Sequence, residues 1–241
     1  KRVVVDNISP TCTVDFSNPD NTDGEARYYA GDANMTIHIT EANFYPGDVH
    51  FNVTCDGAPY AVSPSWGGDT DHHTGTFTFT QEGKYEGTMT YTDKSGNVMA
   101  TYTIQTFVID RTKPEIHVEV NNEHDDNIPA YTEKDIIPSV VVSDKYLDGS
   151  SVQGEYTRYV WNKKDVIATK PKLETGAQSG EQTKFDLQKI GETQDNDGIY
   201  QLTGRARDKA GNSNEASMTF IVSRYGSVYV LGDYFKSVVN D

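Results

Sequence analysis

Two cysteines are the residues in this sequence best suited to nucleophilic or redox chemistry. Cys12 alternates with Val14 in one apolar stretch, and Cys55 alternates with Val53 in another. Because successive side chains of a strand point to opposite faces, each thiol is expected on the same face as core residues. Two interpretations stay open: a disulfide across the core, which needs Cα atoms less than about 7 Å apart, or two inert buried thiols. A core-facing thiol is a poor nucleophile in either case.

The adjacent pair His72 and His73 is the obvious place to look for a metal ligand. On a strand the two imidazoles point to opposite sides, which suits no single metal site. The sequence also contains no G-x-S-x-G nucleophile elbow, no P-loop and no H-E-x-x-H motif. We therefore predict that the protein is not an enzyme.

Asp93 and Asp208 each begin a D-K-x-G-N motif, at residues 93–97 and 208–212. Aspartate accepts hydrogen bonds from backbone amides, and glycine and asparagine tolerate positive φ, so the motif predicts a hairpin turn. Either aspartate is also a candidate calcium ligand. Turn chemistry alone accounts for every residue type in the motif, so we favour the turn and expect no cofactor other than this weaker calcium candidate.

An internal repeat organises the chain. V-V-V-D-N-I-S-P at 3–10 recurs as F-V-I-D-R-T-K-P at 107–114, and the segment 82–97 recurs at 197–212. The second copy is longer between these segments, and the polar stretch 169–181 is the expected insertion. The repeat predicts one domain at 1–109, a second at 110–223, and a junction or the start of a further module at 224–241.

The elements that must position these residues are strands. M-T-I-H-I-T at 35–40, F-N-V-T-C at 51–55 and F-T-F-T at 77–80 alternate apolar and polar residues, with Gly, Pro, Asn and Asp between the runs. Only 231–239 has a helical period over more than a turn or two. The pattern predicts an all-β chain of antiparallel sandwiches.

A G-x-Y motif occurs once in each copy and makes the sandwich prediction more specific. Tyr85 and Tyr200 each open a strand two residues after a glycine that follows an acidic residue. This arrangement is typical of the tyrosine corner, in which the phenol bonds to upstream backbone. Gly87 and Leu202 stand where antibody domains carry a cysteine, so the usual disulfide between sheets is absent.

Together these motifs resemble the bacterial Ig-like repeats found in large surface proteins and secreted multimodular enzymes of Gram-positive gut bacteria. The resemblance rests on D-N-I-S-P and D-R-T-K-P at the module starts, the G-x-Y and D-K-x-G-N motifs, and a middle element in the first copy. That middle element comprises Trp66, Gly68, Asp69, His73, Thr74 and Phe77. The resemblance covers nearly all of the first copy and both ends of the second. It implies two tandem immunoglobulin-like β-sandwich domains, a packed structural role for Trp66, and a location outside the cell, on its surface or secreted.

Charge and hydropathy limit the partners. Asp and Glu number 36 against 21 Lys and Arg, a net charge of −15, which repels nucleic acid and anionic membranes. No run of 18 apolar residues is present, so no membrane insertion is expected. The acidity attracts cations or basic proteins, or simply keeps the protein soluble, which is the default interpretation. The chain begins and ends inside repeating pattern, so we expect a fragment whose targeting signals lie elsewhere.

The leading functional hypothesis is a non-catalytic, adhesin-like pair of surface modules that binds a host protein or glycoprotein. Repeats of this kind act as spacers or adhesive domains, and some resemble binders of host glycoproteins, so immunoglobulin is among the candidates. The alternative is a pair of passive spacer or accessory modules in a secreted carbohydrate-active enzyme or adhesin. A third, weaker hypothesis is a tandem repeat stiffened by calcium. Neighbouring modules of the same chain are further partners.

Exposed tyrosine and arginine side chains are the expected anchors of such an interface. Tyr45 and Tyr60 lie in turn-rich parts of the first domain. In E-Y-T-R-Y-V-W at 155–161, an inward-facing Tyr159 would leave Tyr156 and Arg158 facing outward. We therefore predict ligand contacts at Tyr45, Tyr60, Tyr156 and Arg158.

Overall fold

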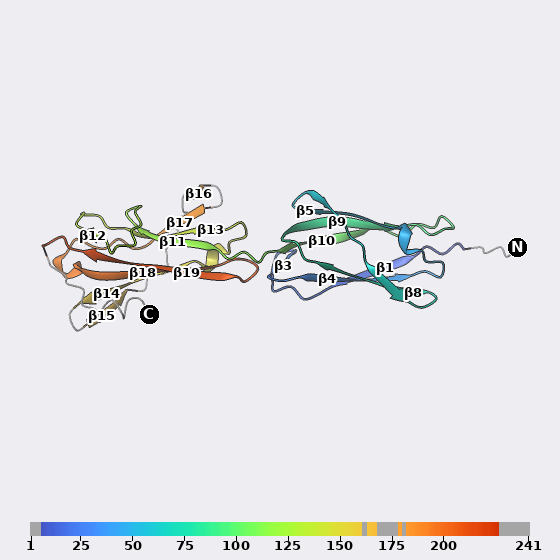
Figure 1. The fold of residues 1–241 in the computed structure, drawn as a ribbon, viewed down its shortest axis with the longest axis horizontal. Coiled ribbons are helices and arrows are strands. Elements are labelled where there is room, and N and C mark those ends of the chain that lie inside the picture. Colours follow the sequence, from blue (N-terminus) through green and yellow to red (C-terminus); the bar gives the residue numbers. More distant parts are fainter. Residues whose placement is uncertain (1–5, 161–162, 168–177, 180–181, 227–241) are drawn as a thin grey trace. The chain divides into compact units, whose positions relative to one another are not determined.

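The structure is a computed structural model that describes residues 6–160, 163–167, 178–179 and 182–226. The chain divides into two compact units, which we call unit 1 (Lys1–Arg111 with Lys209–Gly211) and unit 2 (Thr112–Asp208 with Asn212–Asp241). Each unit consists of two packed β-sheets (Figure 1). The chain is all-β, and both units are immunoglobulin-like sandwiches, as the sequence predicts.

Unit 1 packs a four-stranded sheet against a six-stranded one. The first has the order β1 (Thr11–Phe16), β4 (Ala33–Thr40), β8 (His72–Phe79), β7 (Ser65–Gly68). The second has the order β2 (Asn21–Asp23), β3 (Ala26–Tyr29), β10 (Tyr102–Ile109), β9 (Gly83–Tyr91), β5 (Val49–Cys55), β6 (Ala58–Tyr60). A short 3-10 helix, η1 (Pro46–Asp48), precedes β5.

Unit 2 repeats the two-layer arrangement. One sheet has the order β11 (Glu115–Val120), β13 (Pro138–Ser143), β17 (Gln182–Asp186), β16 (Gln178–Ser179). The other has the order β12 (Ala130–Tyr131), β19 (Ser213–Val222), β18 (Gly198–Arg207), β14 (Gln153–Val160), β15 (Lys163–Ile167). Two 3-10 helices, η2 (Gly149–Ser151) and η3 (Gln194–Asn196), lie in its loops.

Three predictions fall wholly or mainly on residues that the structure does not describe. The expected insertion at 169–181 is described only at β16, and the segment 224–241 only at 224–226. The helical period at 231–239 lies outside the described residues altogether. Within the described part of the chain, no helix is long and apolar enough to cross a membrane.

Alternation along the strands builds both cores. In β4, Met35, Ile37 and Ile39 are buried while the residues between them face outward, as predicted. In unit 1 the rings of Tyr85 and Phe107 stack with centroids 4.7 Å apart. Unit 2 has its own core of buried residues, drawn from both of its sheets. Burial of this apolar surface is the main force that holds the sheets of each unit together.

Each sandwich has a tyrosine corner, as predicted from the G-x-Y motif. The Tyr85 hydroxyl donates to the carbonyl of Gln81 (2.7 Å), and the Tyr200 hydroxyl donates to the carbonyl of Asn196 (2.6 Å). Both rings are fully buried. Burial raises the pKa of both phenols above the ordinary value, that of Tyr200 to about 12, so both stay protonated donors at neutral pH.

Each unit has two ends, which we name by how the chain uses them. In unit 1 the chain enters β1 where Thr11 pairs with Thr40, which also pairs with His72. It leaves β10 at Ile109, which pairs with Gly83 at the opposite end of the sandwich. In unit 2, β11 begins at the Glu115–Ser143 pair and β19 ends at the Val222–Gly198 pair, again at opposite ends. We call these the entry end and the exit end of each unit.

Candidate functional site

Three carboxylates that are distant in sequence meet at the entry end of unit 1. Asp6 lies before β1, Glu41 follows β4, and Asp93 follows β9, and each places an oxygen within 4.8 Å of the others. Glu41 and Asp93 are buried. Among the described residues, none of the three forms an ion pair, and their hydrogen-bond partners are neutral N–H donors. The cluster therefore concentrates uncompensated negative charge at this end.

The turn that carries Asp93 confirms the turn prediction. Asp93 Oδ1 accepts the backbone N–H groups of Ser95 and Asn97, both at 2.8 Å, and Oδ2 accepts the Asn97 side-chain amide at 2.7 Å. Gly96 has a φ of 91°, which favours glycine. Burial raises the pKa of Asp93, but the hydrogen bonds from Asn97 and Ser95 outweigh it, so the pKa lies below its usual range.

The D-K-x-G-N turn that begins at Asp208 is built in the same way. Asp208 Oδ1 accepts the backbone N–H of Asn212 (2.9 Å), and Oδ2 accepts its side-chain amide (2.8 Å). Asp144 directly follows β13, as Glu41 follows β4, and its carboxylate lies within 4.8 Å of that of Asp208. Carboxylate oxygens are the ligands that calcium prefers. Turn capping already accounts for the aspartates, so the calcium role of Asp93 or Asp208 stays a prediction.

Asp6 joins three segments at the entry end of unit 1. Its Oδ1 accepts the backbone N–H of Ile8 (3.1 Å), and its Oδ2 accepts the side-chain amide of Asn43 (2.8 Å). The Asn97 side-chain amide donates to the backbone carbonyl of Asp6 (3.3 Å). The segment before β1, the loop 41–48 and the turn 93–98 are therefore held side by side.

These three segments expose apolar side chains. Ile8 is 73% exposed, Tyr45 49% and Val98 62%, and in the described residues only one other large hydrophobic side chain, Tyr225, is exposed. The Lys94 ammonium lies 5.0 Å from the centre of the Tyr45 ring and also pairs with Asp48. Single exposed hydrophobics are ordinary, whereas a group of them on one surface is typical of an interaction site. We call Ile8, Tyr45 and Val98 the entry patch.

Unit 2 has polar residues at the positions that correspond to the entry patch. In the repeat, Ile8 corresponds to Thr112 and Val98 to Ser213. Tyr45 precedes η1 as Asp148 precedes η2. Because the same fold forms with polar side chains at all three positions, the fold itself does not require the apolar ones.

The predicted anchors lie in different environments. Tyr45 is exposed, as expected for an anchor. Tyr60 is partly buried and packs on core rings, with its centroid 5.1 Å from that of Tyr85 and 5.9 Å from that of Phe79. Its main contacts are therefore with the core of unit 1.

The outward orientation predicted for Tyr156 and Arg158 is wrong. Tyr156 is only 3% exposed, pairs with Leu202 and belongs to the core of unit 2. Arg158 shares that inward face, where its side chain packs against Gly198. Tyr159 is on the opposite face, where its hydroxyl donates to the Gln201 side chain (3.2 Å). The apolar residue Val152, which is in phase with Tyr156 and is buried in the structure, is the sequence signal that indicates the inward face. Trp161 lies outside the described residues.

The two cysteines are free, so the disulfide interpretation is wrong. Cys12 pairs with Ile39 near the entry end, whereas Cys55 pairs with Tyr85 towards the exit end. Cys12 lies beside Ile39, near one end of β4, and Ala33 lies at the other end of β4, towards the exit end. At 3.3 Å per residue, Ile39 and Ala33 are about 20 Å apart. Bonding requires Cα atoms less than about 7 Å apart. Burial raises the pKa of the Cys12 thiol to about 11, so it is a poor nucleophile at neutral pH.

Trp66 is packed, as predicted, and the histidine pair points to opposite sides. The Trp66 ring lies over Gly75, where an added Cβ would come within 3.0 Å of it. His73 stacks on Phe44 with centroids 4.3 Å apart, while His72 is exposed. The two imidazoles therefore cannot bind one metal ion together.

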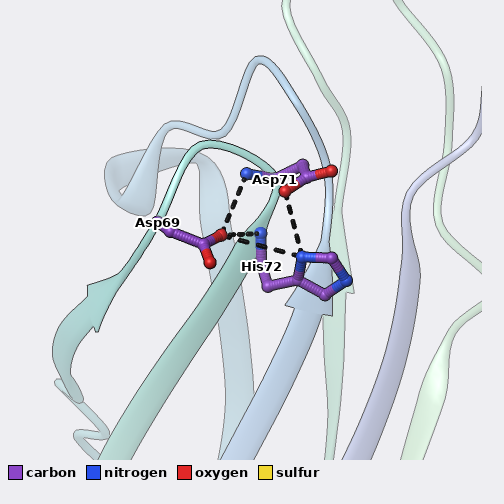
Figure 2. Close-up of side chains that lie close together, drawn as sticks. All are labelled: Asp69, Asp71 and His72. Atoms are coloured by element: carbon purple, nitrogen blue, oxygen red, sulfur yellow. Dashed lines mark hydrogen bonds and ion pairs between the residues drawn. The ribbon is translucent and has the colours of Figure 1, made fainter.

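The hairpin between β7 and β8 holds a second polar cluster, made of Asp69, Asp71 and His72 (Figure 2). Asp69 Oδ1 accepts the backbone N–H groups of His72 (3.0 Å) and Asp71 (3.4 Å). These hydrogen bonds lower the pKa of Asp69. All three side chains are exposed and adjacent in sequence, so turn capping explains their proximity.

Unit 2 has a shallow polar groove of about 720 Å³ beside the start of β19, which includes Asp148, Arg205, Arg207 and Glu215 in its lining. Arg205 pairs with Glu155 (3.0 Å) and with Glu215, and Arg207 lies 3.7 Å from Asp148. Such exposed pairs contribute little stability. Because the charges of the groove are balanced within the unit, it has no excess charge to attract an ionic ligand.

No protein-family model and no curated protein sequence matches the chain. The chain is similar to the solved ectodomain of mouse nectin-like molecule 4, with a TM-score of 0.41 and 12% identity, over 91% of this chain and 66% of that one. It is also similar to a chimeric titin Z1Z2 tandem (TM-score 0.24, 12% identity, 88% and 100% covered). A third similar structure is the polymeric Ig receptor ectodomain of a teleost fish (TM-score 0.24, 13% identity, 82% and 94% covered).

At these identities the likeness concerns the fold alone. The chain's own paired sheets and tyrosine corners place it in a broad class, that of proteins built from tandem immunoglobulin-like β-sandwiches. A fold of this class does not define a function, which has to be argued from the surface.

Proposed function

We propose that this chain is a non-catalytic, extracellular pair of modules of a bacterial surface protein, and that it binds a host protein or glycoprotein through the entry patch. Immunoglobulin is among the candidate partners. The observation that carries the proposal is the exposure of Ile8, Tyr45 and Val98 on one end of unit 1, where the equivalent positions of unit 2 are polar. Apolar surface that has no role in the fold becomes favourable when a partner covers it, and a group of such side chains is typical of an interface.

The charge around the patch indicates the chemistry of the partner. Asp6, Glu41 and Asp93 lie beside the patch and have no ion-pair partner among the described residues. A complementary surface would place an aliphatic or aromatic side chain on the patch and a lysine or arginine beside it. Charge of this kind steers association and is screened by salt. Binding should therefore weaken as sodium chloride is raised.

The test is a titration of the 241-residue chain against immobilised mucins, serum proteins and secreted antibodies. The key variant combines Ile8→Thr, Tyr45→Asp and Val98→Ser, which gives unit 1 the polar residues that unit 2 already has. The fold tolerates those residues in unit 2, so we expect the variant to fold. We expect at least about a thirtyfold loss of affinity, because a true anchor costs about 2 kcal/mol or more.

Tyr225→Ser is the matched control, because it removes an equally exposed aromatic side chain from unit 2. It should bind like the wild type. Binding that survives the triple change would refute the patch as the site. If the wild-type chain captures none of these proteins, the alternative is favoured: passive spacer or accessory modules of a secreted carbohydrate-active enzyme or adhesin.

A further inference from the structure

In each unit, hydrogen bonds hold the chain at the point where the last described strand ends. β10 ends at Ile109 and β19 ends at Val222, and an arginine follows two residues later in both units. We call Arg111 and Arg224 the exit arginines.

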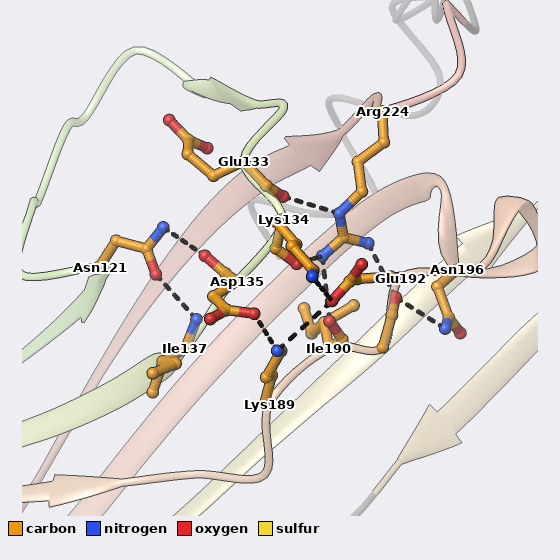
Figure 3. Close-up of polar contacts among 11 residues, drawn as sticks. Asn121, Glu133, Lys134, Asp135, Ile137, Lys189, Ile190, Glu192, Asn196 and Arg224 are labelled. Carbon is orange, nitrogen blue, oxygen red and sulfur yellow. Dashed lines mark hydrogen bonds and ion pairs between the residues drawn. The ribbon is translucent and has the colours of Figure 1, made fainter.

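Arg224 directs its guanidinium at main-chain oxygens of two loops of unit 2. Its Nε donates to the carbonyl of Glu133 (2.8 Å), and its terminal nitrogens donate to those of Gly191 (2.8 Å), Ile190 (3.0 Å) and Lys134 (3.4 Å) (Figure 3). Arginine offers five N–H donors in a planar fork, whereas lysine offers three from a single nitrogen. A lysine at this position would form fewer of these hydrogen bonds.

Hydrogen bonds also hold the backbone at Arg224 and Tyr225 in place. The Asp197 carboxylate accepts the N–H groups of Arg224 (3.2 Å) and Tyr225 (3.1 Å). The Tyr225 hydroxyl donates to the carbonyl of Glu192 (2.6 Å). The main chain and both side chains are therefore bound to unit 2 where the last strand ends.

Unit 1 has equivalent hydrogen bonds at Arg111, made to different loops. The backbone N–H of Arg111 donates to Glu82 (2.6 Å), which precedes Gly83 of the G-x-Y motif as Asp197 precedes Gly198. The Arg111 guanidinium donates to the carbonyl of Thr80 (2.8 Å) and pairs with Asp32. Because these contacts of the exit arginine recur in two units whose loops differ in sequence, they do not depend on one particular loop.

The position of the exit arginines matters when the chain is pulled. In each unit the first strand begins at one end and the last described strand ends at the other, so tension applied at these points draws the two strands along their own axes. Near the exit, β10 pairs with β3 and β19 pairs with β12, both in parallel. Inter-strand hydrogen bonds lie across the pull, so several must break together before a strand slides. The bonds of the exit arginine lie where the last strand would first separate.

We propose that the exit arginines slow the unfolding of each unit when the chain is under tension, so that the units transmit force along the chain while they stay folded. This function is independent of the entry patch, and it applies whether the modules bind a partner or act as a spacer.

The test is constant-force pulling of the 241-residue chain between reference modules, which should show two unfolding events. Arg224→Lys should accelerate one event about tenfold and Arg111→Lys the other, because each loses one or two hydrogen bonds of the guanidinium at the loaded point. Both variants keep the positive charge. Arg224→Gln is the second variant should the lysine substitution prevent unit 2 from folding.

Two controls separate this role from general stability. Arg205→Lys changes an exposed, paired arginine of β18 and should unfold like the wild type under force. Val142→Ala removes methyl groups from the buried core of unit 2 and lowers its stability to urea without altering the exit. Exit variants with wild-type rates under force would overturn the proposal. So would a Val142→Ala variant that accelerates unfolding as much as Arg224→Lys for the same loss of urea stability.

Discussion

Replacing Tyr200 with phenylalanine tests the tyrosine corner of unit 2 with little disturbance of packing. The ring can keep its place, stacked on Phe220 with centroids 5.2 Å apart, and only the hydroxyl is lost. That hydroxyl donates to the carbonyl of Asn196 at 2.6 Å. Losing it leaves a carbonyl without its partner, so unit 2 should lose about 1–3 kcal/mol of unfolding free energy. Tyr85→Phe should have a similar effect on unit 1, through Gln81.

The assay is urea and thermal unfolding of the whole chain, followed by circular dichroism and calorimetry. For domains of about 100 residues, each kcal/mol lowers the melting temperature by about 4–8 °C. Each variant should shift one transition and leave the other in place, because the two cores are separate. Tyr45→Phe is the control, since a change on an exposed ring should stay within about 0.5 kcal/mol. A Tyr200→Phe variant as stable as the wild type would show that the corner hydrogen bond contributes no net stability.

Three further predictions follow from burial and close packing. Burial raises the pKa of Tyr200 from 10 to about 12, so the folded unit holds a proton that the unfolded chain releases. The stability that this raised pKa contributes is fully present below pH 10 and is lost as the pH rises towards 12. The check is the urea midpoint, which should fall over this range in the wild type but less in Tyr200→Phe. Cys12, with a pKa of about 11, should react slowly with iodoacetamide at pH 8 in the folded chain. After unfolding without reductant, mass spectrometry should find both Cys12 and Cys55 alkylated, and a bridged fraction would contradict the structure. Gly75→Ala should force a Cβ against the Trp66 ring, destabilise unit 1 by about 1–3 kcal/mol and change the tryptophan fluorescence, whereas an unchanged spectrum and midpoint would count against this packing.

The features predicted correctly depend on neighbours in the sequence. Asp93 caps a turn that ends at Asn97, and Tyr200 bonds to Asn196, so each interaction closes within four residues. Glycine, asparagine and aspartate have conformational preferences that hold in any fold. The alternation that predicts strands is also local, which is why the all-β class and the two sandwiches could be inferred from the residues alone.

Alternation has a period of two, and it does not specify which set of side chains faces the core. In β14 the alternation predicts a strand, but the predicted outward orientation of Tyr156 and Arg158 is wrong. The opposing strand settles the matter, because Tyr156 pairs with Leu202 in a buried row. A shift of one residue would have exposed every core side chain of the strand.

A local sequence pattern also does not specify distances along and between strands. Cys12 and Cys55 both face the core, as alternation predicted, but they lie towards opposite ends of the sandwich and cannot bond. Asp6, Glu41 and Asp93 are far apart in the chain and meet because β1 begins where β4 and β9 end. The entry patch forms there for the same reason. The turns, corners and strand periods therefore follow from residue types and spacing, whereas the buried faces, the unbonded thiols and the surface patch follow from the pairing register and strand order, which depend on contacts between distant parts of the chain.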